Sequence, residues 1–276
     1  MLKLGLIAGG GGLPVEIAQA CEKAGRPVFV IRLRGFAGPE LAAYQGAEIG
    51  VAELGRCIAA LKQAGCKAVC LAGIVTRPDF SALKPDFRGL MLLPKVISAA
   101  RKGDDALLRV LVSAFEQEGF KVEGAHDALG ELTLPAGPLG RLRPDERQQS
   151  DLKRALEVAR AIGSQDIGQG AVVCDGLVLA VEAQEGTDAM LSRVAGLPEH
   201  LRGAPGAPRG VLAKAPKPIQ ETRVDLPTIG VETIEAAARA GLAGIAGEAG
   251  RLLVLERERV AARADELGLF VYGVQA

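Results

Sequence analysis

The stretch Leu4-Gly5-Leu6-Ile7-Ala8-Gly9-Gly10-Gly11-Gly12-Leu13-Pro14 places a short apolar run directly before four consecutive glycines and a proline. The apolar run is typical of a buried strand, and proline is tolerated in the first turn of a helix. Helical spacing of apolar residues continues from Val15 to Cys21 and ends before Gly25, a suitable C-terminal cap. This strand, glycine loop and helix predict the first unit of an α/β domain.

Residues up to 125 repeat this alternation of strand and helix. Further strands are predicted at 27–31, 67–72 and 120–123, and further helices at 54–64, 90–100 (interrupted by Pro94) and 105–118. Continuous apolar strands between amphipathic helices are typical of a parallel sheet that is covered on both faces. We therefore expect residues 1–132 to form a Rossmann-like domain that binds a nucleotide or a phosphate.

Residues 133–150 differ in character, because prolines, glycines and a polar run separate two regions that each contain strand and helix patterns. We interpret this segment as a linker. Beyond it, Asp175-Gly176 lies between two apolar runs, which is a strong signal of a hairpin. Helices are predicted at 151–162, 231–240 and 256–267, and strands at 251–255 and 269–274.

The expected fold is therefore an α/β protein of two domains. Residues 1–132 form the Rossmann-like domain, and residues 151–276 form a catalytic α/β domain. We expect the ligand to lie between them, because the closing of a cleft between domains excludes water.

Composition excludes several classes of protein. The 33 basic and 33 acidic residues cancel, which argues against a nucleic-acid partner, and aromatic residues are only 3%. The sequence contains neither a membrane-length apolar run nor a signal-peptide pattern at its N-terminus, so we expect a cytoplasmic protein. The five cysteines form no C-x-x-C pair and are expected to be buried, and the separation of His126 from His200 argues against zinc.

The glycine loop could bring backbone N–H groups to a phosphate at the start of a helix. It fails as a dinucleotide fingerprint, because Pro14 stands where the third glycine should be and Arg32 and Arg34 follow the second strand in place of an acid. We expect no nicotinamide or flavin cofactor. Two interpretations stay open: a tight turn only, or a phosphate contact. The candidate contacts are Gly10, Gly11, Gly12 and Leu13, followed further on by Thr76 and Arg77.

Two groups of acidic residues are candidates for catalysis. Asp104 and Asp105 follow Gly103 at the start of a helix, where one carboxylate could cap the helix and the other could bind a metal or ligand. The second group surrounds Gly186-Thr187 and consists of Glu182, Glu185 and Asp188. Carboxylates of this kind can hold Mg²⁺ or orient a water for attack on phosphorus.

Basic and acidic residues also alternate in the segment 214–228. Prolines keep this stretch extended, so its two lysines cannot share a helix. Lys and Arg can neutralise phosphate oxygens, which together with the acids above suits a diphosphate site. A solvated surface is the alternative for each segment. The candidate substrate contacts here are Lys214, Lys217, Gln220, Arg223 and Thr228, and Asp225 is the candidate for metal ligation or water activation.

The segment Arg88-Gly89-Leu90-Met91-Leu92-Leu93-Pro94-Lys95-Val96-Ile97 is strongly apolar with basic residues at its ends. We expect it to belong to the core. The alternatives are a wall for acyl chains or a contact with a membrane surface.

Four segments together resemble one known family. They are Ile7–Pro14 with its glycines, Gly103-Asp104-Asp105-Ala106-Leu107-Leu108-Arg109, Val181-Glu182-Ala183-Gln184-Glu185-Gly186-Thr187-Asp188, and Lys217–Gly230 with its Asp225-Leu226-Pro227-Thr228-Ile229-Gly230. In this order they are similar to the LpxI-type UDP-2,3-diacylglucosamine pyrophosphatases of lipid A biosynthesis. The Glu-Gly-Thr-Asp and Asp-Leu-Pro-x-Ile-Gly segments are the specific part of the resemblance.

The resemblance implies hydrolysis of the diphosphate of UDP-2,3-diacylglucosamine to UMP and 2,3-diacylglucosamine 1-phosphate (lipid X), with attack of water on the phosphorus nearer the sugar. It implies a divalent cation, Mg²⁺, with Asp225, Asp104 and Glu182 as candidate ligands and Asp225, Asp104, Glu185 and Asp188 as candidate catalytic residues. It also implies a lipid substrate and a peripheral contact with the cytoplasmic face of the inner membrane, while a homodimer stays open.

Two other functions stay open at this point. One is an NADP-type oxidoreductase in which Arg32 or Arg34 meets a 2′-phosphate. The other is a regulator that binds a nucleotide without catalysis.

Overall fold

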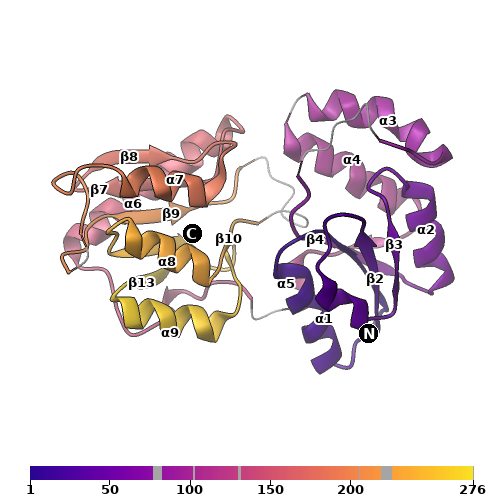
Figure 1. The fold of residues 1–276 in the computed structure, drawn as a ribbon, viewed down its shortest axis with the longest axis horizontal. Helices are drawn as coiled ribbons and strands as arrows, with labels where there is room; N and C mark the ends of the chain where they lie inside the picture. Colours follow the sequence, from indigo (N-terminus) through magenta and orange to yellow (C-terminus); the bar gives the residue numbers. More distant parts are fainter. Residues whose placement is uncertain (77–82, 102, 130–131, 205, 219–225, 276) are drawn as a thin grey trace. The chain divides into compact units, whose positions relative to one another are not determined.

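The computed structural model describes residues 1–276 except 77–82, 102, 130–131, 205, 219–225 and 276. The chain forms two compact units (Figure 1), one of residues 1–131 and one of residues 132–220 with 226–276. Each unit has its own main sheet and its own hydrophobic core. Within these described ranges, no helix is both long and apolar enough to cross a membrane.

The first unit is built on a parallel five-stranded sheet in the order β3-β2-β1-β4-β5. Its strands are β1 (Leu4–Ala8), β2 (Val28–Leu33), β3 (Gly46–Ile49), β4 (Ala68–Ala72) and β5 (Lys121–Val122). The chain leaves β1 toward β2 and later returns to β4 on its other side, so right-handed crossovers place helices on both faces. Every residue of β1 is consequently buried. The expected Rossmann-like parallel sheet is confirmed.

The helices of this unit lie close to where the sequence predicts them. They are α1 (Leu13–Lys23), the 3₁₀ helix η1 (Pro39–Ala43), α2 (Leu54–Gln63), α3 (Phe87–Ala100), α4 (Asp104–Gln117) and α5 (Ala125–Leu129). Ile7 of β1 packs with Leu61 of α2 and Phe115 of α4 in one core cluster.

The helix α3 differs from the expectation in two ways. It begins at Phe87, because the Asp86 carboxylate accepts a hydrogen bond from the Gly89 N–H at 2.8 Å, and it continues through Pro94. Of its residues only Ala99 and Ala100 are buried. The expectation that segment 88–97 belongs to the core is therefore wrong.

The second unit contains a mixed six-stranded sheet in the order β6-β13-β11-β9-β7-β8. The three middle strands β9, β11 and β13 are parallel, whereas β6, β7 and β8 are added antiparallel to their neighbours. The strands are β6 (Gly137–Pro138), β7 (Gly170–Cys174), β8 (Leu177–Val181), β9 (Val211–Lys214), β11 (Gly244–Glu248) and β13 (Phe270–Val274). A separate parallel pair joins β10 (Thr228–Ile229) to β12 (Leu253–Val254).

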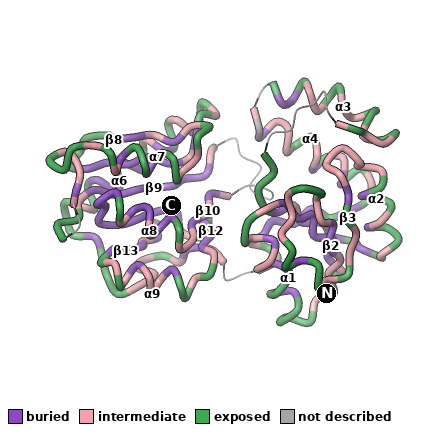
Figure 2. The backbone as a smooth tube through the Cα atoms, in the orientation of Figure 1, coloured by how far each residue is buried: buried purple, intermediate pink, exposed green. Residues whose placement is uncertain are grey.

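Four helices cover the two faces of this sheet. They are α6 (Glu146–Ser164), α7 (Gly186–Ala195), α8 (Val231–Arg239) and α9 (Arg257–Leu267). Val172 of β7 packs in a cluster with α7, α8 and α9, whereas its neighbours Ala171 and Val173 pack with α6. The period of two residues along a strand explains this division. Figure 2 shows the central strands of this sheet as buried and the edge strand β8 as partly exposed. The expected second α/β domain is confirmed.

The segment 133–150, which we interpret as a linker from its sequence, contributes structure to the second unit. Leu134 is fully buried in its core and β6 pairs with β13. The polar run begins α6, because Asp145 caps the helix and the side chain of Gln148 returns a hydrogen bond to the Asp145 N–H. This capping box is a sequence signal that the composition of the segment hides.

The Asp-Gly hairpin is confirmed between β7 and β8. Asp175 and Gly176 have φ angles of 53° and 79°, as a turn of type I′ requires. The buried carboxylate of Asp151, on α6, accepts hydrogen bonds from the N–H groups of Asp175 at 2.9 Å and Gly176 at 2.7 Å. A side chain of α6 thus holds the turn.

The Asp151→Ala variant should lose about 2–4 kcal/mol of unfolding free energy, because hydrogen bonds to a charged acceptor are worth about 1.5–3 kcal/mol each. Urea denaturation measures this loss. The matched control is Asp145→Ala, which removes the cap of the same helix and should cost about 1 kcal/mol. Equal losses in the two variants would contradict the role of Asp151 as the anchor of the turn.

All five cysteines are free and buried, as the sequence predicts. Burial raises the pKa of Cys57 to about 12 and that of Cys70 to about 12. Since the thiolate is the reactive form, these thiols have the character of small apolar side chains.

Candidate active site

The first candidate element is the glycine loop at the edge of the parallel sheet. The strand order changes direction between β1 and β4, and ligands of α/β proteins bind at such switch points. Gly9–Gly12 follow β1 at this edge, and Gly73–Thr76 follow β4.

The two loops are joined by backbone hydrogen bonds. The Gly10 N–H donates to the Ile74 carbonyl at 2.8 Å, and the Ile74 N–H donates to the Gly10 carbonyl at 2.8 Å. A Cβ atom on Gly9 would lie 2.7 Å from the Ile74 oxygen, and one on Gly73 would lie 2.6 Å from the Gly10 oxygen. Gly9 and Gly73 are therefore required by the contact between the loops, and the Gly10 N–H already has an acceptor.

The next N–H groups are differently placed. The N–H groups of Gly11, Gly12 and Leu13 have no acceptor among the described residues. They lie at the start of α1, directly before Pro14. Gly11 is exposed and has a φ of 82°. Three N–H donors at the positive end of a helix can bind an anion such as a phosphate. Thr76 is exposed beyond β4, whereas Arg77 lies outside the described residues.

The acidic pair of α4 is only partly described. Gly103, with a φ of 128°, occupies the N-cap position where the sequence suggested an aspartate. Asp105 is buried and forms an ion pair with Arg109 one turn further along the helix. The side chain of Asp104 lies outside the described part of the structure.

The second candidate element is a buried polar network at one edge of the second sheet. Because β7 is antiparallel to both β8 and β9, the last residues of β8 and β9 lie at the same edge. Glu182 follows β8, Lys214 ends β9, and Thr187 lies in the first turn of α7. The sequence suggested all three residues, and the structure brings them together.

A hydroxyl group links the two charges of this network. The Thr187 Oγ1 donates to the Glu182 Oε1 at 2.8 Å and accepts from the Lys214 Nζ at 2.8 Å. The Lys214 Nζ also donates to the backbone carbonyl of Thr228 at 3.2 Å. Lys214 and Glu182 are only 4% and 6% exposed. Burying an ammonium is costly unless polar partners compensate it, so Thr187, and Glu182 through the same hydroxyl, hold the Lys214 side chain in place.

One acceptor of the network has no partner. The Glu182 Oε2 is buried without a hydrogen bond from any described group. A Cβ atom on Gly170 would lie 2.7 Å from it, so glycine at this position gives the carboxylate its space. The sequence analysis missed Gly170, and only the pairing of β7 with its neighbours reveals its role.

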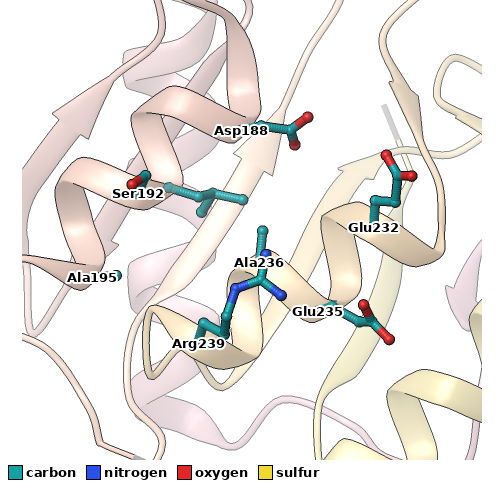
Figure 3. A pocket seen from close by; sticks show the side chains of 8 residues that line it. Asp188, Ser192, Ala195, Glu232, Glu235, Ala236 and Arg239 are labelled. Carbon is teal, nitrogen blue, oxygen red and sulfur yellow. The ribbon is translucent and has the colours of Figure 1, made fainter.

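Glu185 and Asp188 are not part of this network. Backbone N–H groups, followed by Arg193 at 2.6 Å, hold the pKa of Glu185 below its usual range. Asp188 lines a cavity of about 460 Å³ between α7 and α8, together with Glu232, Glu235 and Arg239 (Figure 3). Neighbouring residues of a helix point about 100° apart, which separates Asp188 from Thr187.

Lys217 is engaged by a residue that the sequence analysis missed. Its Nζ lies 2.6 Å from the Asp166 Oδ1, and both side chains are largely buried. Asp166 has a φ of 56° and follows α6, far from Lys217 in sequence. Gln220, Arg223 and Asp225 lie outside the described residues.

The same residues offer few ligands for a metal ion. No three His, Cys, Asp or Glu side chains of the described residues converge on one point. Glu182 can offer one oxygen, and further ligands would come from Asp225, from Asp104 or from the substrate itself. Mg²⁺ commonly binds through one or two carboxylates and the substrate phosphates, so this supply of ligands is compatible with it.

Arg32 and Arg34, the candidate contacts for a 2′-phosphate, both have protein partners. Arg32 donates to the carbonyls of Leu41 and Tyr44 at 3.2 Å each. Arg34 forms ion pairs with Glu48 and Glu53. Both arginines therefore hold the segment after β2, and nothing in their geometry favours an NADP site.

Comparison with known proteins shows what the two units are similar to. The LpxI N-terminal domain matches residues 3–132, and the LpxI C-terminal domain matches residues 135–272. A UDP-2,3-diacylglucosamine pyrophosphatase LpxI from Caulobacter vibrioides is 66% identical over 274 residues, which are 99% of this chain and 98% of the relative. These matches define the class of protein: a two-domain α/β enzyme of lipid A biosynthesis. The chain belongs to the LpxI family.

The similarity to one solved structure is weak. The biotin carboxylase subunit of pyruvate carboxylase aligns with 63% of this chain and 35% of its own at 16% identity, with a TM-score of 0.24.

Substitution of Gly11 tests the loop. Gly11→Ala and the control Gly25→Ala both place a Cβ at a positive φ without a clash, since the Cβ of the first would lie 3.8 Å from the Ile74 Cδ1 and that of the second would have no atom within 4 Å. Both should therefore cost about 1–2 kcal/mol of stability. Only Gly11 carries one of the three N–H donors and adjoins the other two. We expect Gly11→Ala to weaken substrate binding about tenfold or more in calorimetric titration, and Gly25→Ala to bind as the wild type does. Equal affinities of the two variants would mean that the loop is only a turn.

Substitution of Thr187 tests the buried network. Thr187→Val removes the hydroxyl at nearly equal volume and should reduce unfolding free energy by about 1–3 kcal/mol, because Glu182 and Lys214 each lose a partner. Thr187→Ser keeps the hydroxyl and is the control, with most of the stability retained. Urea denaturation provides the comparison, and a valine variant as stable as wild type would show that the hydroxyl does not link the charges.

Proposed function

We propose that this protein hydrolyses the diphosphate of UDP-2,3-diacylglucosamine, giving UMP and 2,3-diacylglucosamine 1-phosphate (lipid X). The observation that carries the proposal is the 66% identity between this chain and the UDP-2,3-diacylglucosamine pyrophosphatase LpxI from Caulobacter vibrioides, over nearly the whole length of both chains. The three N–H donors of the glycine loop and the buried ammonium of Lys214 support it, because both are suited to phosphate oxygens.

The chemistry needs two contributions from the chain. Positive groups must stabilise charge on the diphosphate, and we assign this role to the loop N–H groups and to Lys214. A carboxylate must orient a water and take up its proton, and we assign this role to Asp225, with Asp104, Glu185 and Asp188 as the other candidates. In the proposed reaction, water attacks the phosphorus nearer the sugar, and UMP leaves with the bridging oxygen.

We further propose that the reaction depends on Mg²⁺. Asp225, Asp104 and Glu182 would supply its protein ligands beside the diphosphate oxygens. The bound ion would neutralise phosphate charge. The buried Glu182 Oε2 without a partner supports the inclusion of Glu182.

The remaining substrate contacts belong to the same proposal. They are Gly10, Gly11, Gly12, Leu13, Thr76, Arg77, Asp105, Thr187, Lys214, Lys217, Gln220, Arg223 and Thr228. Lys217 would have to release the Asp166 carboxylate in order to bind the substrate. Gly10 would contribute by shaping the loop, since its N–H already donates to the Ile74 carbonyl. We place the protein at the cytoplasmic face of the inner membrane, where a substrate with acyl chains is found.

A phosphorus NMR time course with UDP-2,3-diacylglucosamine tests the proposal. We expect the diphosphate signals to be replaced by two phosphomonoester signals with Mg²⁺, and this conversion to stop when a chelator is added. Binding without conversion would instead identify a nucleotide-binding regulator. Conversion that is unaffected by the chelator would remove the metal from the proposal and leave the hydrolysis.

Asp225 should be the most sensitive position. Loss of a water-activating or metal-binding carboxylate in Asp225→Ala should lower kcat by two decades or more, roughly 2.7 kcal/mol of barrier. Substrate should still bind, because the uridine and acyl contacts remain. Steady-state kinetics and a binding titration give both quantities, with Asp145→Ala as the control. A folded Asp225→Ala variant within tenfold of wild-type kcat would move the role to Asp104, Glu185 or Asp188.

A further inference from the structure

The helix α3 carries an apolar face that the described residues of its unit leave largely exposed. Phe87, Leu90 and Met91 are 79%, 56% and 69% exposed. They are spaced three and four residues apart, so they lie on one side of the helix, and the exposed Pro94 continues this side by one turn. Large apolar side chains at such exposure in a contiguous patch mark a binding surface.

The charged side chains carried by α3 itself are all basic, while Asp86 caps its start and Glu118 pairs with its Arg88. α3 contains no acidic residue, although the whole chain has equal numbers of acids and bases. Lys84, Lys95 and Arg101 are exposed and form no ion pair with a described side chain, whereas Arg88 is paired with Glu118. Three available cations therefore surround the apolar residues.

A shallow cavity of about 200 Å³ adjoins the face between α3 and α4. Leu92 and Lys95 line it from α3, and Arg109 and Val110 line it from α4. The basic side chain of Lys95 beside the apolar Leu92 and Val110 matches the two parts of an anionic lipid, which has a phosphate group next to its acyl chains.

We propose that α3 docks this protein on an anionic phospholipid bilayer. Phe87, Leu90 and Met91 enter the interface between headgroups and acyl chains, while Lys84, Lys95 and Arg101 contact the phosphates. The inference rests on the proposed function only for the reason that the protein would need a bilayer, which is that a substrate with acyl chains is supplied from one. The surface itself follows from exposure and charge.

A second copy of the chain is a poorer occupant for this face. In a twofold dimer the same patch would meet itself, which would bring the cations of one copy toward those of the other without an acid on α3 to compensate them. An anionic surface offers the complementary charge.

The absence of tryptophan from the chain permits a direct test of insertion. Met91→Trp places a single reporter on the α3 face, and Leu177→Trp places one at an exposed position of β8 as the control. With vesicles of phosphatidylglycerol and phosphatidylcholine, the emission of Met91→Trp should shift to shorter wavelength and be quenched by brominated lipid. Leu177→Trp should show neither change. No shift for Met91→Trp, or equal shifts for both variants, would overturn the proposal.

Vesicle flotation tests the charges. The variant Lys84→Gln/Lys95→Gln/Arg101→Gln should bind anionic vesicles about 100-fold more weakly, since each basic residue near the surface contributes about fivefold. Lys153→Gln, on the exposed side of α6, is the control and should bind as wild type. Unchanged vesicle binding by the triple variant would overturn the proposal, as would a shift from dimer to monomer in sedimentation without loss of vesicle binding.

The outcome is independent of catalysis. Flotation and fluorescence are measured without substrate, and hydrolysis is measured separately with substrate dispersed in detergent. Loss of vesicle binding with normal hydrolysis in detergent supports the docking role of α3, whereas absence of hydrolysis in wild type would contradict only the proposed function.

Discussion

Close contact between two glycine-containing loops determines the candidate phosphate site. Gly9 and Gly73 have no Cβ atoms, and this lets the loops after β1 and β4 approach until Gly10 and Ile74 exchange two hydrogen bonds. The contact fixes the end of β1 and therefore the start of α1. The N–H groups of Gly11, Gly12 and Leu13 therefore lie at the N-terminus of α1, where the helix dipole favours an anion.

The second unit buries charged side chains. Lys214 and Glu182 lie in a low-dielectric sheet edge and share the hydroxyl of Thr187. Such a network is stable only if all its members are present, because removal of one partner leaves a buried charge without compensation. The same requirement holds the ammonium rigidly, which is what a group that binds phosphate needs.

Both units thus offer positive groups, while the whole chain is neutral. The N–H donors of the first unit and the ammonium of the second suit the diphosphate of a UDP-sugar, and the cations around α3 suit phosphates of a bilayer. The positive groups that suit phosphates are gathered locally, and the net charge of the whole chain does not reveal them. The LpxI family models match both units.

The sequence by itself determined the fold class, the Asp-Gly hairpin, the buried cysteines and most strands, because these depend on local periodicity and turn chemistry. It also selected Glu182 and Thr187 in an acid-rich segment that resembles a family, and Lys214 in a segment where basic and acidic residues alternate. Tertiary structure alone decided that Thr187 joins the other two, that Asp188 faces a different cavity, and that Gly170 makes room for a carboxylate. Strand pairing brings such residues together from distant parts of the chain. The exposure of α3 was likewise decided by packing, since an apolar segment has the same pattern whether or not a neighbour covers it.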